Sequence, residues 1–323
     1  MSFRILGTGM SVPERIVKND ELANYVETND EWIKQRVGIA ERRVATTETC
    51  ADMAEKAAKA ALENAGVKPE ELDLIIASTV SGDYASPSLS CLVQKRIGAT
   101  CMAFDISAAC SAFMFLLETA AGYFARGHKK VLLVSSEKLS KLVDWSDRST
   151  CVIFGDGAGA AVLGEGDSYF DSVFNVTGDD EVIRIPTYAG NSPFSALEPE
   201  KPVIHMAGQE TFKYAVNAIV HDIKTLLERN SISPDEVKYV VPHQANKRII
   251  DAASRRLGIP YEKFVVDIDK YGNTSSASLP IASTSSEERG AEARGPVVFT
   301  AFGGGPLTPR ALSDGKKNSH NIL

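Results

Sequence analysis

The sequence predicts an α/β protein of two similar halves, in which buried strands form mixed, mainly parallel sheets. Short apolar runs alternate with stretches of helical periodicity, which is typical of parallel strands joined by right-handed crossovers. The segment 62–76 (LENAGVKPEELDLII) is echoed 165 residues later by 227–241 (LERNSISPDEVKYVV). We therefore expect an internal duplication, with one half at residues 1–168 and the other at 169–323.

Each repeated unit reads as a helix end, a turn and a buried strand, followed by a second helix and a second strand. The expected strands, in chain order, are residues 1–9, 72–76, 103–106, 129–137, 154–163, 237–241 and 265–268. The first run is too short and too rich in glycine for a secretory signal. The glycine-rich turn at 154–159 precedes a strand instead of opening a helix after one, which argues against a Rossmann nucleotide site.

Composition excludes several classes of function. The formal net charge is −7, which gives no support to nucleic-acid binding. The five cysteines are odd in number and none is in a CxxC pair, so neither a disulfide framework nor a zinc site is expected. No apolar run reaches the length of a membrane span, and we expect a cytoplasmic protein without a metal.

Cys110 is the first candidate for chemistry. The run 103–106 breaks into small residues around Cys110 and then into a helix. The N-terminus of a helix favours a thiolate, although a buried structural cysteine is the commoner case. The corresponding loop of the second half holds Asn273 in the sequence GNTS. Because sites in such sheets lie at the C-terminal ends of strands, the duplication predicts that the two loops meet.

His243 is the second candidate, because it follows the apolar run 239–242 at the end of a predicted strand. An imidazole N–H and the amide of Asn273 would together supply two donors to a carbonyl oxygen. Alternatively, His243 is a hydrogen-bonded core histidine and Asn273 is a turn residue. The glycine run 303–305 is either a flexible turn or a backbone oxyanion pocket.

Several motifs together resemble those of β-ketoacyl-ACP synthase III, the initiating condensing enzyme of type II fatty-acid synthesis. They are AAC at 108–110, PHQAN at 242–246, GNTS at 272–275, AFGGG at 301–305, GDGAGA at 155–160, DEWI at 30–33 and RVGI at 36–39. The resemblance covers residues 1–305. It implies the thiolase-like fold with five layers, α-β-α-β-α, and a homodimer that uses acyl-CoA and acyl carrier protein (ACP) as substrates and needs no cofactor.

The resemblance also implies a reaction and its residues. Cys110 would take the acyl group of a starter acyl-CoA, and His243 with Asn273 would stabilise the enolate formed when malonyl-ACP loses carbon dioxide. The products would be 3-oxoacyl-ACP, CoA and carbon dioxide. The backbone N–H groups of Cys110 and Gly304 would form the oxyanion hole. The residues implied in substrate binding are Trp32 and Arg148 around adenine, Arg36, Gly208, Phe212 and Asn246 along the CoA path, and Arg248 against ACP.

Two departures from the family pattern stand out. Ser86 occupies a position where short-starter members often have an aromatic residue that closes the acyl pocket across the dimer, so we expect longer or branched starters to be accepted. Pro306 and Pro309 lie where the family has an apolar closing strand, and proline is unfavourable in a central strand. The preceding segment 283–290 is also a poorer helix than expected there.

Several other enzyme classes share part of this residue pattern. A biosynthetic thiolase needs a second catalytic cysteine late in the chain, and elongating condensing enzymes have a second histidine where Asn273 stands. A papain-like hydrolase shares the order Cys, His, Asn but not the duplication. The remaining alternatives are a condensing enzyme of a specialised polyketide or quinolone pathway, and a non-catalytic homologue suggested by the unusual C-terminal segment.

Overall fold

The computed structural model describes residues 2–187, 190, 192–288, 295–303 and 307–314. The strands are β1 (Ser2–Ser11), β2 (Ile16–Lys18), β3 (Glu41–Arg43), β4 (Leu74–Ser78), β5 (Met102–Asp105), β6 (Lys130–Lys138), β7 (Asp156–Gly166), β8 (Tyr169–Val176), β9 (Ile183–Arg184), β10 (His205–Met206), β11 (Tyr239–Pro242), β12 (Pro296–Thr300) and β13 (Leu307–Asp314).

The α-helices are α1 (Asn19–Leu22), α2 (Asp30–Val37), α3 (Cys50–Ala65), α4 (Leu89–Ile97), α5 (Ala112–Ala125), α6 (Arg148–Cys151), α7 (Gly208–Arg229), α8 (Lys247–Leu257), α9 (Ile268–Tyr271) and α10 (Ser278–Glu288). Short 3-10 turns are η1 (Pro69–Glu71), η2 (Ala109–Ser111), η3 (Leu139–Lys141), η4 (Tyr261–Lys263) and η5 (Ser275–Ala277).

Two mixed sheets repeat one topology. The first sheet has the order β1-β7-β6-β4-β5, in which β4 is parallel to β5 and β6, and β7 is antiparallel to β6 and β1. The second has the order β8-β13-β12-β11, with β11 parallel to β12 and β13 antiparallel to β12 and β8. The predicted internal duplication is therefore confirmed. The chain crosses from the first sheet to the second between β7 and β8, and the exact boundary at residue 168 stays a prediction.

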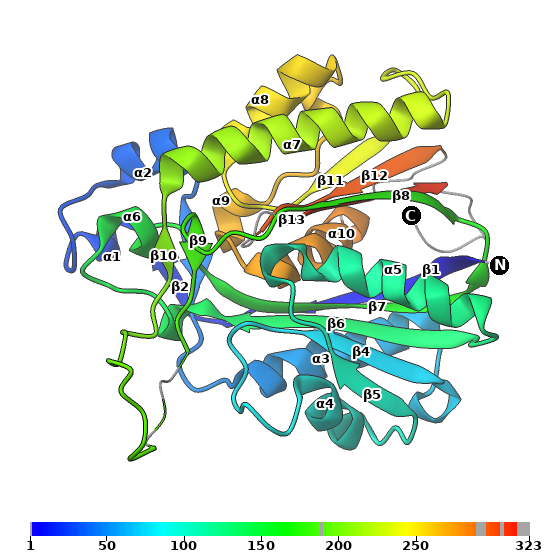
Figure 1. Cartoon of the computed structure of the whole chain (residues 1–323). Helices are drawn as coiled ribbons and strands as arrows, with labels where there is room; N and C mark the ends of the chain where they lie inside the picture. Colours follow the sequence, from blue (N-terminus) through cyan, green and yellow to red (C-terminus); the bar gives the residue numbers. More distant parts are fainter. Residues whose placement is uncertain (1, 188–189, 191, 289–294, 304–306, 315–323) are drawn as a thin grey trace.

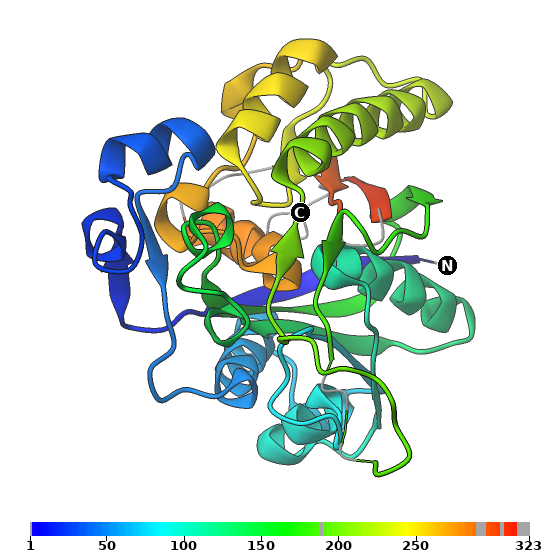
Figure 2. The same cartoon turned by 60° about the vertical axis from the view of Figure 1, so that its left-hand side comes forward.

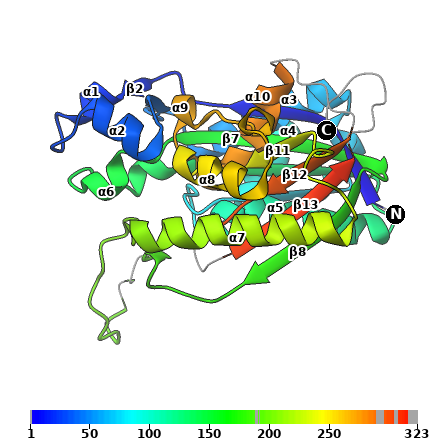
Figure 3. The ribbon, with the colours of Figure 1, turned by 90° about the horizontal axis from the view of Figure 1, so that it is seen from above.

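The elements form five layers (Figure 1), as expected for the thiolase-like arrangement. Helices α3 and α4 cover one face of the first sheet, α5 and α10 lie between the sheets, and α7 and α8 cover the second sheet. Figure 3 shows α7 and α8 from above the second sheet. A separate apolar core fills each interface between layers. Ala57 of α3 and Leu132 of β6 are buried in one core, Leu117 of α5 and Phe299 of β12 in a second, and Ile223 of α7 in a third. Burying both faces of both sheets stabilises this stack.

The glycine-rich turn before β7 has a packing role. A Cβ on Gly155 would lie 2.2 Å from the carbonyl oxygen of Tyr271, and one on Gly159 would lie 2.8 Å from the backbone of Ile281. Only glycine allows the first sheet to approach the second half so closely. The interpretation of this segment as a turn entering a strand is confirmed by β7.

The predicted strand at 265–268 is wrong. Phe264 forms only an isolated bridge with Val240, and α9 already begins at Ile268. The side chain of Gln244 replaces a strand partner here: its Oε1 accepts from the backbone N–H groups of Asp267 and Ile268, at 3.1 and 3.2 Å. The other expected strands correspond to β1, β4, β5, β6, β7 and β11.

The C-terminal segment is more regular than its composition suggested. β13 lies between β12 and β8, and α10 reaches Glu288. The β12–β13 pairing ends at Thr300 and Arg310, so Pro309 lies beyond it, in register with Phe174 of β8, and needs no donor toward β12. In α10 the hydroxyls of Ser283 and Thr284 donate to the carbonyls of Leu279 and Pro280, at 2.9 Å each. These bonds satisfy buried hydroxyls that would otherwise destabilise the helix.

One end of the molecule collects several short elements from both halves. Figure 2 turns this end forward and shows α2, α6, α9 and the β9–β10 pair grouped there. The turns η2 and η5 are in contact with each other and hold corresponding positions in the two halves. Within the part of the chain that the structure describes, no helix has the length and apolar character needed to cross a membrane.

Candidate active site

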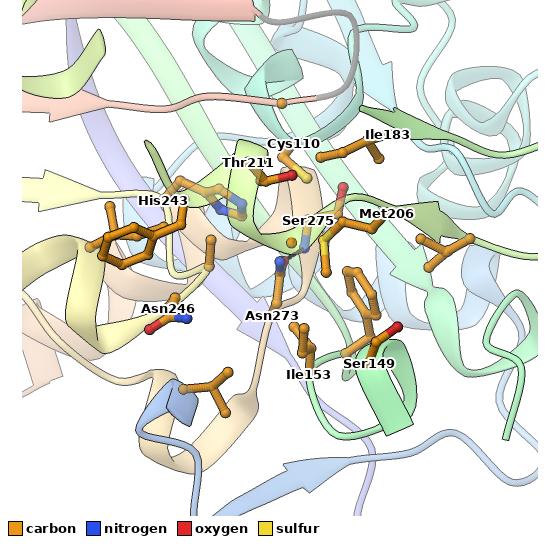
Figure 4. A pocket seen from close by; sticks show the side chains of 18 of the residues that line it. Cys110, Ser149, Ile153, Ile183, Met206, Thr211, His243, Asn246, Asn273 and Ser275 are labelled. Carbon is orange, nitrogen blue, oxygen red and sulfur yellow. Dashed lines mark hydrogen bonds between the residues drawn. The ribbon is translucent and has the colours of Figure 1, made fainter. Parts of the chain in front are cut away.

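A cavity of about 560 Å³ runs inward from this end of the molecule to the contact between the two halves. Its inner wall includes Cys110, His243 and Asn273, whose side chains point into the same space (Figure 4). The three residues come from η2, from the end of β11 and from the loop between α9 and η5. The predicted meeting of the two loops is therefore confirmed.

Cys110 is held by an unusual turn. The preceding Ala109 has a positive φ of 46°, and Ser275 in the corresponding turn of the second half has a φ of 50°. Non-glycine residues rarely adopt this conformation, which often marks functional sites. Gly303 lies directly behind: a Cβ there would stand 3.1 Å from the backbone nitrogen of Cys110. The absence of a side chain at residue 303 leaves this backbone region uncrowded.

The ionisation of Cys110 differs from the sequence-based expectation. Burial raises the pKa of the Cys110 thiol to about 11, a hydrogen bond with the Ser275 side chain lowers it, and the charge of Glu137 raises it further. Desolvation therefore opposes the start of α5, and a pKa in this range favours the thiol near neutral pH, in contrast to the thiolate expected from the helix start alone.

His243 is almost completely enclosed, with 2% of its surface exposed. Its backbone N–H donates to the carbonyl of Thr300 at 2.7 Å, and its Nδ1 lies 2.6 Å from Oγ of Ser278. The ring of Phe302 packs edge-on against the imidazole, with centroids 5.2 Å apart. Burial lowers the pKa of His243 to about 3, so the ring is neutral at pH 7 and donates through one nitrogen only.

Asn273 is fixed through both its backbone and its side chain. Its backbone N–H donates to Ile153 at 2.9 Å, and its carbonyl accepts from Gly155 at 3.0 Å, which ties the second half to the loop before β7. The side-chain Oδ1 accepts from the backbone N–H of Ser275 at 2.8 Å. Since the oxygen is engaged, the amide nitrogen Nδ2 is the end that can donate into the cavity.

Glu137 is a buried carboxyl close to this wall that the sequence did not suggest. One oxygen accepts from Ser81 at 2.5 Å and from the N–H of Val80 at 3.1 Å, and the other accepts from Ser276 at 2.7 Å. Burial raises the pKa of Glu137, and these hydrogen bonds lower it. The carboxyl therefore links β6 to η5, the turn that follows Asn273.

The outer part of the cavity is lined by aromatic and basic side chains. Arg148 stacks on Trp32 at 4.7 Å, and Arg36 lies 5.7 Å from the same ring. Arg248 lies over the ring of Phe212 at 5.4 Å. Because Arg148 and Trp32 touch directly, a flat ring enters between them only if they separate. These three arginines concentrate positive charge at the cavity of a protein whose formal net charge is −7.

Comparison with known proteins places the chain among condensing enzymes. Residues 104–178 match the family model of 3-oxoacyl-[acyl-carrier-protein] synthase III, and residues 227–309 match the model of its C-terminal part. A β-ketoacyl-[acyl-carrier-protein] synthase III of Clostridium acetobutylicum is 43% identical over 316 residues, which covers 94% of this chain and 96% of the relative. The chain belongs to the β-ketoacyl-ACP synthase III family.

Other members of the β-ketoacyl-ACP synthase III family agree with this. The curated relative of Aquifex aeolicus is 45% identical over 309 residues, covering 94% of this chain and 97% of its own. A crystal structure from the same organism superposes with a TM-score of 0.91 at 42% identity, covering 97% of this chain and all of that one. A structure from Pseudomonas aeruginosa PAO1 gives 0.91 at 31% identity, over the full length of both chains. The protein is an acyltransferase of the condensing type with a thiolase-like fold.

Most of the predicted site residues lie on this one cavity. They are Trp32, Arg36, Cys110, Arg148, Gly208, Phe212, His243, Asn246, Arg248 and Asn273. Gly304 lies outside the described residues. Ser86 is exposed and does not line this cavity, whereas its neighbours Ala85 and Pro87 line a second one. Among the described residues, no group of three or more His, Cys, Asp or Glu side chains is arranged to hold a metal ion.

Proposed function

We propose that this protein catalyses the decarboxylative condensation of an acyl-CoA with malonyl-ACP, giving 3-oxoacyl-ACP, CoA and carbon dioxide. The observation that carries the proposal is the convergence of Cys110, His243 and Asn273 on one cavity with a basic, aromatic outer part. Family membership supports the reaction class.

In the first step, the sulfur of Cys110 attacks the thioester carbonyl of acyl-CoA. The new C–S bond forms as the bond to the CoA sulfur breaks, and the thiol proton ends on CoA, so atoms and charge balance. The backbone N–H groups of Cys110 and Gly304 are proposed to stabilise the oxyanion. Because burial raises the pKa of Cys110, the sulfur has to lose its proton as it attacks.

In the second step, the C–C bond to the malonyl carboxylate breaks, and its electron pair becomes the enolate of the thioester. His243 and Asn273 are proposed to donate to the enolate oxygen through Nε2 and Nδ2. The carbanion then attacks the acyl carbonyl on Cys110, the C–S bond breaks with its electron pair on sulfur, and the cysteine thiolate takes one proton from the solvent. A neutral imidazole suits this role, since its N–H is too weak an acid to transfer the proton to the enolate and donates a hydrogen bond instead.

The outer cavity fits the shared pantetheine-phosphate chemistry of CoA and ACP. Trp32 and Arg148 are proposed to bind adenine, and Arg36, Gly208, Phe212 and Asn246 to line the path to Cys110. Arg248 at the rim is proposed to meet acidic ACP. We further propose a homodimer in the cytoplasm that uses no resident cofactor, and light scattering in solution tests the dimer.

A second cavity of about 760 Å³ supports the acceptance of starters larger than acetyl. It reaches Ala109, next to the nucleophile, and is lined by Ala85, Pro87 and Leu142. Ser86, between two of these residues, is small. We propose that longer or branched acyl chains are transferred, and a panel of acyl-CoA starters measures this.

The proposed reaction is tested in two stages. Incubation with acyl-CoA followed by peptide mass spectrometry should place one acyl group on the peptide of Cys110, and none on it in Cys110→Ala. Addition of malonyl-ACP should then release carbon dioxide and 3-oxoacyl-ACP. A chain that folds but takes no acyl group from any starter would instead support a non-catalytic homologue.

A specialised pathway is the second candidate. A priming β-ketosynthase from the R1128 polyketide biosynthetic pathway superposes with a TM-score of 0.89 at 34% identity and covers 97% of this chain. The fatty-acid role is favoured by the higher identity of the curated relatives. Comparing turnover with a fatty-acid ACP and a polyketide ACP distinguishes the two.

A further inference from the structure

Ser278 touches the histidine of the site but does not face the substrate cavity. It is the first residue of α10, and 2% of its surface is exposed. Its Oγ lies 2.6 Å from Nδ1 of His243. Ser278 is not among the residues that line the cavity, so any effect on chemistry has to act through the imidazole.

The surroundings of Ser278 give this hydrogen bond a direction. The backbone N–H of Gln244 points to the same Oγ, at 3.4 Å. A backbone N–H only donates, so Oγ accepts there and its own hydrogen is left for another partner. Nδ1 of His243 is the acceptor within reach. In that arrangement Nδ1 carries no proton, and the proton of the neutral ring is on Nε2.

Two other buried hydroxyls of α10 form a different hydrogen bond from that of Ser278. Ser283 and Thr284 donate to backbone carbonyls four residues earlier in the helix, at 2.9 Å each. This is the usual bond of a buried helical hydroxyl. Among the described residues, no such backbone acceptor is found for Ser278, whose hydroxyl is directed to His243 instead.

We propose that Ser278 is a positioning residue that holds His243 in the tautomer protonated at Nε2. The proposal rests on the proposed function, in which Nε2–H of His243 donates to the enolate oxygen. A ring protonated at Nδ1 would present a lone pair to that oxygen and would repel it. Ser278 therefore keeps Nε2–H of His243 available as one of the two side-chain donors in the second step. The first step, acylation of Cys110, does not use this donor.

The tautomer is measured directly by ¹⁵N NMR of the full chain labelled at histidine, with the His243 signals assigned by their loss in His243→Gln. Wild type should show the protonated nitrogen at Nε2, and Ser278→Ala should lose this preference. Observation of the proton at Nδ1 in wild type would overturn the proposal without requiring any variant to fold.

The kinetic test separates the two steps. In Ser278→Ala, decarboxylation of malonyl-ACP should fall by about 10- to 100-fold, which is less than the full loss of an oxyanion donor. Acyl transfer from acyl-CoA to Cys110 should stay near wild type. Ser278→Thr keeps the hydroxyl and should restore most of the decarboxylation. The matched control Ser283→Ala removes a buried hydroxyl of the same helix and should change neither step.

The outcomes separate this inference from the proposed function. If Ser278→Ala loses both steps equally, or keeps both and the Nε2 tautomer, Ser278 is only structural and the proposal fails. If Ser278→Ala changes the tautomer while His243→Gln leaves decarboxylation intact, the placement of the proton by Ser278 stands and the role of His243 falls.

Discussion

The side-chain oxygen of Asn273 accepts a hydrogen bond from the backbone N–H of Ser275, with 2.8 Å between Oδ1 and N. The bond closes the turn that begins η5 and fixes which end of the carboxamide is exposed to the cavity. Because Oδ1 faces the backbone, Nδ2 faces the substrate. A residue that looks like an ordinary turn asparagine in the sequence is thereby oriented as a donor.

Asn273→Asp tests this orientation with little change in shape. The carboxylate retains an oxygen for the N–H of Ser275, but it replaces the donor by a negative charge where the enolate develops. We expect decarboxylation of malonyl-ACP to fall by about 10²- to 10³-fold, the cost of one oxyanion donor. Acylation of Cys110, measured by mass spectrometry on the same sample, should persist. Equal loss of both steps would contradict the assigned role.

Gly303→Ala tests the backbone behind the nucleophile. Its Cβ would stand 3.1 Å from both the nitrogen of Cys110 and Oγ of Ser111, so the turn has to shift. A displaced oxyanion donor should slow acylation by about tenfold or more, since errors of 1 Å cost up to about 100-fold. Stopped-flow measurement of CoA release reports the rate.

Gly122→Ala is the matched control for Gly303→Ala. Gly122 is in α5, and a Cβ there meets no atom within 4 Å. Alanine should leave acylation unchanged and stabilise the helix by up to about 1 kcal/mol, because glycine is unfavourable in a helix interior. Equal slowing by both substitutions would indicate a general effect on folding instead of crowding at Cys110.

Much of the architecture follows from local patterns. The repeated segments at 62–76 and 227–241 predict two equivalent sheets, and this symmetry places Cys110 and Asn273 on facing turns before any contact is known. His243 follows from its position at the end of β11. These predictions succeed because strand ends and helix starts depend on neighbouring residues.

Long-range contacts decide what the sequence misses. Ser278 is 35 residues from His243, and no local pattern relates the two. The segment 265–268 is apolar enough for a strand, but Gln244 takes its backbone donors. The thiol of Cys110 has a helix start beside it, yet burial dominates, and burial is a property of the assembled protein.

The free energy of unfolding should depend on pH because His243 is buried in the folded protein. Burial lowers the pKa of His243 from 6.5 to about 3, so between these values the unfolded chain binds a proton that the folded chain does not. The neutral ring's contribution is therefore complete above pH 6.5 and is lost as the pH falls toward 3.

We expect the difference in unfolding free energy between wild type and His243→Gln to shrink as the pH falls from 7 to 4. Plotted against pH, this difference in unfolding free energy should approach a slope of about 1.4 kcal/mol per pH unit well below pH 6.5. Urea unfolding at four or five pH values measures it, and other titrating groups cancel in the difference. A difference that is flat over this range would mean that His243 is solvated in the folded protein.

Ser86→Phe tests the proposed selection of starters. Ser86 is exposed between Ala85 and Pro87, which line the second cavity near Ala109. In the proposed homodimer, a benzyl side chain at this position should narrow the acyl pocket, filling space that a long or branched acyl chain needs and leaving room for acetyl. The ratio of kcat/KM for a medium-chain acyl-CoA to that for acetyl-CoA should fall by about tenfold or more, comparable to the effect of one or two methylene groups in a pocket.

Ser86→Ala, which keeps the side chain small, should leave the ratio unchanged. If wild type already transfers only acetyl, or if Ser86→Phe leaves the ratio as it is, the second cavity does not receive the acyl chain.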